Sequence, residues 1–326
     1  MTQSATSPAQ NSVSVGIGFM LIAVLVISVN DMLIKKLSGG YPLHEMVFFR
    51  SLIGLPIVLW FVHLEGGFTQ LRAKRYGLLF LQGGFLVVAN ILFFMGLAAL
   101  PLAEATALFF AAPLMITVLS VPFLKERVGL FRLSAVLIGF AGVIVMLRPW
   151  EGEPVEGGHL VLLLPVLAAA CYAARQIVTR KLGMTVKASV MTVYLQIIFL
   201  FVSLGFFLVA GDGRYAEGLD NPSLHFVLRA WIWPEGNDIY LFLLLGICSG
   251  VGAYSFSKAY SSADVAVVAP FEYLGLPIAV LFGWMFWGEW PDSVAGLGML
   301  LILAGGLIVF LRERHLNRKL TRMKRV

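Results

Sequence analysis

Ten apolar segments, each close to the length of a membrane span, follow one another along the 326-residue chain. A helix needs about 20 mostly apolar residues to cross the roughly 30 Å hydrocarbon layer of a bilayer. Apolar residues make up 59% of the chain and charged residues only 13%, against about 45–50% and about 25% in soluble domains. These values exclude a soluble enzyme, a disordered chain, a coiled coil and a secreted disulfide scaffold.

The segments are predicted to be helices, because backbone groups in lipid must find their hydrogen-bond partners within the same segment. The alternation of apolar and polar residues expected of a membrane barrel is absent from the sequence. The expected fold class is an all-α polytopic membrane protein with ten transmembrane helices. The predicted spans run from Val15 to Lys35, His44 to His63, Tyr76 to Leu97, Leu102 to Leu124, Leu130 to Leu147, His159 to Thr179, Ala188 to Gly211, Ile239 to Ser257, Val265 to Trp287 and Ser293 to Leu311.

The distribution of lysine and arginine predicts that both termini lie in the cytoplasm. With that orientation most of the 24 basic residues fall in cytoplasmic segments, as the positive-inside rule requires. Residues 1–14 are expected to form a disordered leader, and residues 313–326 a basic tail near anionic lipid. The loop from Asp212 to Asp238 would lie outside, with Trp231 and Trp233 as interface anchors.

The two halves of the chain resemble each other. Four features recur in the same order: a short acidic segment that opens a span, an interior proline, a glutamate after the span, and an Ala-Gly pair. They are Ala103-Glu104-Ala105, Pro113, Glu126 and Ala141-Gly142 in the first half, and Ala263-Asp264-Val265, Pro277, Glu289 and Ala304-Gly305 in the second. The sequence therefore predicts two five-span repeats, at 15–148 and 159–312, joined by a linker at 149–158.

Five spans is an odd number, so two similar halves must cross the bilayer with opposite orientations. Inverted repeats are typical of secondary transporters, because exchanging the conformations of the two halves moves access to a central site from one side to the other. The sequence favours a transporter over a duplication that reflects ancestry alone.

Several motifs, taken in order, resemble those of the EamA-type family of the drug/metabolite transporter superfamily. They are Glu45, Phe48-Phe49-Arg50, Leu100-Pro101-Leu102-Ala103-Glu104-Ala105, Pro113, Lys125-Glu126-Arg127, Ala269-Pro270-Phe271-Glu272-Tyr273 and Gly288-Glu289. The resemblance extends from the first span to Arg312. It implies ten helices in two inverted repeats, a central cavity and alternating access without ATP.

Within this family, Pro270-Phe271-Glu272-Tyr273 and Phe48-Phe49-Arg50 most resemble carriers for riboflavin or S-adenosylmethionine uptake. The resemblance implies a vitamin or nucleoside-like metabolite as substrate and does not fix which one. An exporter of amino acids, drugs or other metabolites with the same fold is the alternative. We expect a multi-pass protein of the bacterial inner membrane.

Five ionisable residues lie inside the predicted spans. They are Asp31, Arg50, Glu104, Arg175 and Glu272. A charged side chain at the centre of a membrane helix costs roughly 2.5–3.5 kcal/mol on insertion scales. These side chains are therefore expected to face the protein interior, where they are candidates for substrate binding or ion coupling. Glu45 and Lys258 are close enough to span ends to reach water.

Glu272 lies between Pro270 and Pro277. Proline removes a backbone donor, and the resulting irregularity is tolerated at membrane depth only beside protein or a water-filled cavity. The Glu272 carboxylate can bind a cationic group or carry a coupling proton. The structural alternative is a salt bridge with Arg175.

Arg50 and Asp31 are expected at similar depths in the outer half of the membrane. A bidentate pair would neutralise both charges, either as a gate that breaks on opening or as a fixed structural contact. Arg50 can instead bind an anionic group of the substrate. Glu104 begins the fourth span, where a helix N-terminus favours an acid, so helix capping is favoured there over substrate coupling.

Uncharged polar residues and small residues complete the candidate set. Residues expected to line the cavity are Gln82, Asn90, Gln176 and Tyr273, the last by stacking on a flat ring. Residues expected at hinges or close helix contacts are Pro113, Pro270, Pro277, Gly246 and Gly250.

Other functions have little support in the sequence. The phosphate-binding loop that ends in Gly-Lys-Ser/Thr is absent, and the five histidines and two cysteines show no metal-ligand spacing. We predict no enzyme activity, no metal or cofactor, and no nucleic-acid partner. A channel or a membrane-embedded enzyme is the alternative of a different class. Expected partners are a small-molecule substrate and membrane lipids; a coupling proton and a homodimer are left open.

Overall fold

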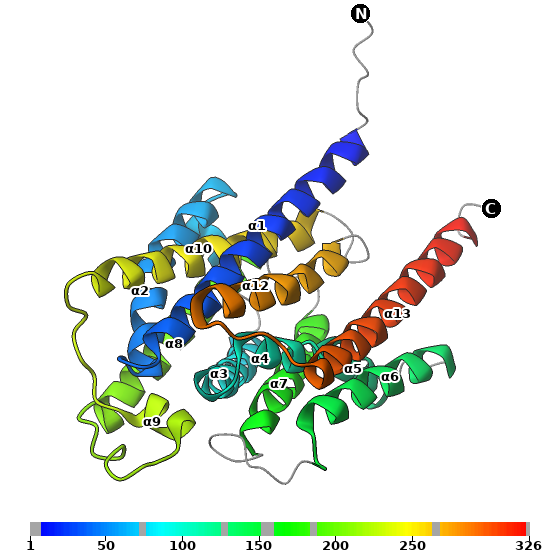
Figure 1. The fold of residues 1–326 in the computed structure, drawn as a ribbon. Coiled ribbons are helices and arrows are strands. Elements are labelled where there is room, and N and C mark those ends of the chain that lie inside the picture. Colours follow the sequence, from blue (N-terminus) through cyan, green and yellow to red (C-terminus); the bar gives the residue numbers. More distant parts are fainter. Residues whose placement is uncertain are drawn as a thin grey trace, which may run out of the picture.

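The computed structural model describes residues 8–71, 76–124, 130–150, 160–182, 188–262 and 268–323. These residues form helices joined by turns, and no strand occurs among them. Figure 1 shows the helices gathered into one bundle. The all-helical part of the predicted fold is confirmed.

The helices follow the predicted spans in order. In the first half they are α1 (Pro8–Leu37), α2 (Leu43–Leu64), the 3-10 helix η1 (Phe68–Leu71), α3 (Tyr76–Ala99), α4 (Leu102–Phe109), α5 (Ala112–Leu124) and α6 (Leu130–Leu147). In the second half they are α7 (Leu160–Leu182), α8 (Ala188–Ala210), α9 (Pro222–Leu228), α10 (Asp238–Ser262), the 3-10 helix η3 (Ala269–Leu274), α12 (Gly275–Trp287) and α13 (Ser293–Met323).

Within the described residues, eight helical segments are long and apolar enough to cross a membrane. They are Ser14–Leu37, Leu43–Leu64, Tyr76–Ala99, Leu102–Phe123, Val161–Thr179, Ser189–Ala210, Asp238–Tyr260 and Pro270–Trp287. Two shorter apolar helices, Leu133–Leu147 and Ser293–Ile308, lie where the fifth and tenth spans are predicted. The protein crosses the membrane several times, and the count of ten stays a prediction.

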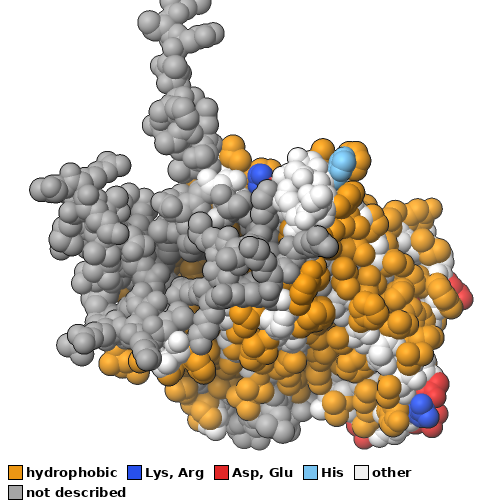
Figure 2. All heavy atoms as spheres, turned by 180° about the vertical axis from the view of Figure 1, so that it is seen from behind, with side chains coloured by type: hydrophobic (Ala, Val, Ile, Leu, Met, Phe, Trp, Pro, Cys, Tyr) orange, Lys and Arg blue, Asp and Glu red, His pale blue; other side chains and the backbone are white. Residues whose placement is uncertain are grey.

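The surface suits a lipid environment. Figure 2 shows a face on which hydrophobic side chains predominate and the visible charged side chains lie near its margins. Phe201 and Leu208 are 70% and 71% exposed. Large exposed apolar areas are unfavourable in water, whereas acyl chains are as apolar as these side chains.

The helices pack mainly across the two halves of the chain. α1 lies against α10, α3 against α7, α2 against α8, and α6 against α13; the last pair runs side by side in Figure 1. Glycines permit the closest crossings: a Cβ on Gly142 of α6 would lie 2.7 Å from the Gly298 carbonyl oxygen of α13. Gly246 and Gly250 of α10 contact α2 at Ile53 and Gly54.

The fourth predicted span is interrupted near its proline. α4 ends at Phe109 and α5 begins at Ala112. A proline ring clashes with the carbonyl group four residues earlier, and Pro113 lies four residues after Phe109. In the first turn of α5 the missing N–H of Pro113 costs no helical hydrogen bond.

The ninth predicted span is interrupted in the same way. η3 ends at Leu274 and α12 begins at Gly275, so Pro277 lies in the first turn of α12. The two interruptions meet, because the Phe110 and Tyr273 rings lie 5.3 Å apart and α4 packs against α12. Interior prolines in both halves therefore produce two broken helices in contact.

Both ends of the described chain are more helical than the sequence indicates. α1 begins at Pro8, inside the segment 1–14 predicted as a disordered leader, and α13 continues to Met323, through most of the predicted tail 313–326. Proline is favoured in a first helical turn, and basic residues are favourable near a helix C-terminus. Residues 1–7, most of the predicted linker and 324–326 lie outside the described residues.

The segment between α8 and α10 folds back over the start of α2. The Trp231 ring lies 5.4 Å from that of Phe48 and 4.8 Å from that of Phe207, whereas Trp233 is 71% exposed. Trp231 thus packs partly against the bundle, and its role as an interface anchor stays a prediction. Glu45 is 0% exposed and accepts a hydrogen bond from the Ile232 backbone nitrogen at 3.1 Å, so the expectation that it reaches water is wrong.

Candidate functional site

Arg50 of α2 lies in an aromatic environment inside the bundle. Its Nη2 donates a hydrogen bond to Asn90 Oδ1 of α3 at 2.6 Å. The guanidinium carbon lies 5.4 Å from the Phe94 ring centre and 5.2 Å from that of Phe199, and the residue is 6% exposed. The cation is held by one amide and two aromatic rings. A pocket lined by side chains of α2, α3, α8 and α9 reaches Asn90 and Phe199.

Asp31 of α1 lies within electrostatic range of Arg50. It accepts a hydrogen bond from Asn30 Nδ2 at 3.1 Å, and Oδ1 of the same asparagine is buried without a partner. Among the described residues no ion pair joins Asp31 to Arg50. The predicted bidentate pair is thus not formed in this structure, because Arg50 binds Asn90 instead.

A second group of side chains surrounds the two helix breaks. The Tyr260 hydroxyl of α10 donates a hydrogen bond to Glu272 Oε1 of η3. Arg175 of α7 lies over the ring of Tyr172, 5.5 Å from its centre, and its Nε is buried without a partner. In the described part of the chain Glu272 and Arg175 form no salt bridge. Tyr172 lies within electrostatic range of both.

Further aromatic and polar residues complete this second group. Gln176 Nε2 donates to the Tyr172 hydroxyl at 2.9 Å, and the Phe109 ring lies 5.5 Å from that of Tyr172. Tyr273 packs on Gly306 of α13. Gln82 is 1% exposed, and no described contact joins it to either group. The structure therefore gathers Arg175, Gln176, Glu272 and Tyr273 around the breaks and leaves Gln82 apart.

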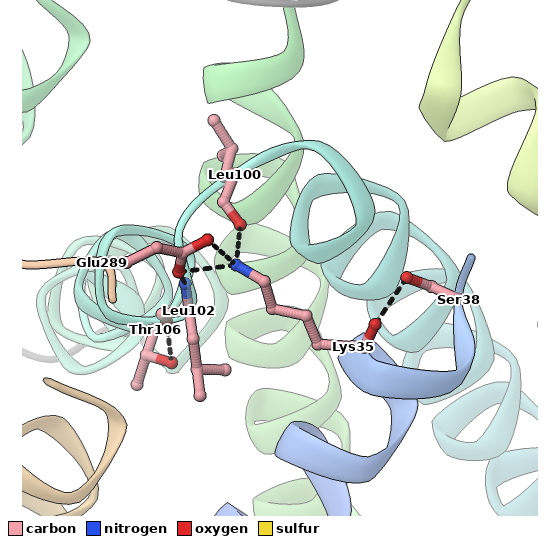
Figure 3. A network of polar contacts seen from close by, with 6 residues as sticks. All are labelled: Lys35, Ser38, Leu100, Leu102, Thr106 and Glu289. Carbon is pink, nitrogen blue, oxygen red and sulfur yellow. Dashed lines mark hydrogen bonds and ion pairs between the residues drawn. The ribbon is translucent and has the colours of Figure 1, made fainter. Parts of the chain in front are cut away.

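A third group of charges lies where α1 ends (Figure 3). Lys35 Nζ donates to both carboxylate oxygens of Glu289, each at 2.8 Å, and to the Leu100 carbonyl oxygen at 2.9 Å. Glu289 Oε2 also accepts from the Leu102 backbone nitrogen at 3.2 Å. An ammonium group has three donors, so this cation is fully hydrogen-bonded. Its side chain is only 9% exposed.

This Lys35–Glu289 network joins the two halves of the chain and caps a helix. Leu100 follows the end of α3 and Leu102 begins α4, so the cation meets a helix C-terminus and the acid a helix N-terminus. Glu104 was the predicted cap of this helix, but its carboxylate has no hydrogen-bond partner among the described residues. Glu289 from the other half takes that role, because it reaches the first amide of α4.

Other polar contacts between the halves lie at both ends of the bundle. Arg148 and Asp292 form an ion pair at 2.5 Å on the side of the Lys35–Glu289 network. At the opposite end Lys258 Nζ lies 2.9 Å from Glu65 Oε1. Burial by itself would raise the pKa of Glu65, but the hydrogen bonds and the charge of the groups around it, Lys258 first and Tyr254 among them, together outweigh burial and hold the pKa below its usual value. The Asp292 pKa is lowered by Arg148.

These contacts were missed from the sequence. In the sequence Lys35 stands only as the end of the first predicted span, and Glu289 only as part of the repeat and of the family motifs. A usable signal was present: the predicted outer side carries few basic residues, and two of them, Lys35 and Arg148, bind acids of the other half. A basic residue on the outer side departs from the positive-inside pattern, and such a departure points to a specific acidic partner.

Comparison with known proteins agrees with this architecture. The EamA-like transporter family matches residues 14–148 and again 159–311. The chain is 34% identical over 224 residues to a riboflavin transporter of Rhizobium johnstonii, covering 69% of this chain and 67% of the relative. It is 28% identical over 305 residues to an S-adenosylmethionine uptake transporter of Rickettsia felis, covering 93% and 95%. A crystal structure with 18% identity has a TM-score of 0.61, over 93% of this chain and 99% of the other, a likeness of fold alone.

The apolar helices and these matches define an integral, multi-pass membrane transporter of small metabolites rather than an enzyme. The chain belongs to the EamA-like transporter family, which matches both of its halves. The family resemblance seen in the motifs is confirmed, as is the similarity to riboflavin and S-adenosylmethionine carriers.

Proposed function

We propose that the protein moves a small organic metabolite across the inner membrane by alternating access, without ATP, through ten spans arranged as two inverted five-helix repeats. The observation that carries the proposal is the contact between the two broken helices, α4–α5 and η3–α12, at Phe110 and Tyr273. Discontinuous helices at a repeat interface are where secondary transporters bind substrates and coupling ions.

The packing of the helices supports inverted repeats. Exchanging each span with its equivalent in the other half converts the α1–α10 pair into the α7–α3 pair. The same exchange leaves the α2–α8, α6–α13 and α4–α12 pairs unchanged, and all of these pairs are in contact. A pseudo-two-fold relation has this property. The start of α1 and the end of α13 lie at the same end of the bundle in Figure 1, as an even number of spans requires.

The substrate is proposed to bind around the helix breaks. The named relatives carry riboflavin or S-adenosylmethionine, and each of these compounds contains a flat heteroaromatic ring. Phe109, Phe110 and Tyr273 offer stacking surfaces there. Glu272 is proposed to bind a cationic group or carry a coupling proton, since no basic side chain neutralises it in the described part of the chain.

The end of the bundle that contains the Lys35–Glu289 network is proposed to be closed in this conformation. The network and the Arg148–Asp292 pair hold α1, α4 and α6 of the first half against the second half. These contacts must separate when the cavity opens on that side, which we assign to the outside of the cell.

Uptake into proteoliposomes tests the proposed function. Purified protein should give saturable, ATP-independent uptake of radiolabelled riboflavin or S-adenosylmethionine, and preloaded unlabelled substrate should accelerate it by counterflow. Protein-free liposomes and the Glu272→Gln variant are the controls, and the variant should lose any acceleration by a proton gradient. Flux that rises linearly with concentration and shows no counterflow would indicate a channel and overturn the proposal.

A further inference from the structure

We propose that Asp31 and Arg50 form a binding subsite for a zwitterionic α-amino acid group of the substrate, with its ammonium group on Asp31 and its carboxylate on Arg50. The proposal rests on the proposed transport function and adds to it the chemical class of one part of the substrate. It starts from hydrogen-bonding groups that the protein itself leaves unused.

Arg50 offers unused donors. A guanidinium group carries five N–H donors, and the structure shows one hydrogen bond, from Nη2 to Asn90 at 2.6 Å. No acidic side chain is bonded to it in the described part of the chain. A buried cation without a bonded counter-ion is unfavourable. A carboxylate can accept two parallel hydrogen bonds from a guanidinium, so an anionic ligand group satisfies this site.

The Asp31 side offers unused acceptors. Asp31 Oδ1 receives a hydrogen bond from Asn30, whereas Oδ2 has no partner among the described residues. Asn30 is 7% exposed, and its Oδ1 is a buried acceptor with no partner. Leaving such an acceptor unpaired costs free energy. An ammonium group brings three donors, which match the acceptors of Asp31 and Asn30.

The two charges are close enough to interact and are not in contact. Each is the charged group that acts electrostatically on the other, yet each is hydrogen-bonded to an asparagine, Asn30 or Asn90. A direct salt bridge between Asp31 and Arg50 would use these donors and acceptors without a ligand, but the described residues do not form one. A zwitterion placed between them pairs both charges and leaves the net charge inside the membrane unchanged.

This chemistry distinguishes the substrates named for the relatives. S-adenosylmethionine carries an α-amino acid group with one ammonium and one carboxylate. Riboflavin carries neither. The unused hydrogen-bonding groups around Asp31 and Arg50 therefore favour a substrate of the first kind.

Calorimetric binding to the purified full-length protein tests the subsite with two matched ligands. S-adenosylhomocysteine and 5′-methylthioadenosine are both uncharged thioethers of adenosine, but only the first has the amino acid group. The wild type should bind S-adenosylhomocysteine at least about tenfold more tightly, since hydrogen bonds to the charged ammonium and carboxylate groups account for the difference. Equal affinities, or binding of riboflavin alone, would overturn the subsite.

Two variants sharpen the same measurement. Asp31→Asn and Arg50→Gln should each weaken S-adenosylhomocysteine binding roughly ten- to hundredfold and leave 5′-methylthioadenosine binding unchanged. An equal loss for both ligands would mean a structural role and overturn the proposal. If a variant does not fold, the comparison of ligands on the wild type still decides. Saturable riboflavin uptake by a protein that shows no preference for the amino acid group would refute the subsite and leave the transport function standing.

Discussion

Lys35 and Arg50 are cations on two consecutive helices of the chain, α1 and α2, and their surroundings differ. Lys35, near the end of α1, uses every ammonium donor on Glu289 and the Leu100 carbonyl group. Arg50, inside α2, makes one hydrogen bond, to an uncharged amide. A fully bonded charge holds two parts of the protein together. A buried charge with unused donors is unfavourable until something binds it, so the first charge is suited to closing the molecule and the second to ligand binding.

Among these predictions, removing the ammonium group of Lys35 should have the largest effect on the free energy of unfolding. Lys35→Met leaves the partly buried Glu289 carboxylate without its cation, and breaking such a pair from one side costs about 3 kcal/mol. Chemical denaturation in detergent should show this loss. Arg50→Gln is the matched control, with a smaller expected loss, because removing a buried charge that has no bonded counter-ion offsets the lost hydrogen bond to Asn90 and the lost ring contacts. Equal losses of stability in the two variants would contradict the difference between Lys35 and Arg50.

Adding a methyl group at two different glycines should show which position matters for helix packing and which for transport. A Cβ on Gly142 would lie 2.7 Å from the Gly298 carbonyl oxygen, which is backbone, so Gly142→Ala should force α6 and α13 apart and cost about 1–3 kcal/mol. A Cβ on Gly306 meets the end of the Tyr273 side chain, which can rotate away. Gly306→Ala should therefore reduce uptake more than stability, as thermal unfolding and transport assays on both variants would show. The reverse ranking would contradict a role for Tyr273 in the site.

The smallest effect is expected with pH, at the opposite end of the bundle. Glu65 has a lowered pKa because Lys258 and neighbouring hydrogen-bond donors stabilise its carboxylate. Such a carboxyl adds stability above its unfolded pKa of about 4.3, and this stability is lost as the pH falls through the lower folded pKa. Glu65→Gln should remove that part of the acid sensitivity, by less than about 1 kcal/mol at a partly exposed pair. Unfolding measured between about pH 5 and 3 would show it. Asp212→Asn, at an exposed pair with Arg214, is the control, and a larger change there would argue against the Glu65–Lys258 contact.

The breaks at Pro113 and Pro277 illustrate what local sequence can predict. A proline acts on the carbonyl group four residues earlier, so its consequence is readable from a short window, and the structure interrupts both helices there. Glu104 illustrates the limit. It stands in the first turn of α4, where an acid is favourable, but a carboxylate from the other half reaches the helix first. A helix-capping preference read from a short segment cannot take account of a carboxylate that tertiary packing brings from the other half of the chain.

Apolar segment length and repeated motifs were enough to predict the all-helical membrane fold and the family, because the first acts over a single segment and the second recur in order along the chain. Which charged groups form pairs depends instead on how the helices pack. Lys35 and Glu289 are 254 residues apart in the chain, and Arg50 binds Asn90 rather than the expected Asp31. The partner of a buried charge depends on which helices pack together and on the direction in which their side chains point. Neither can be read from a pattern of residues along the chain.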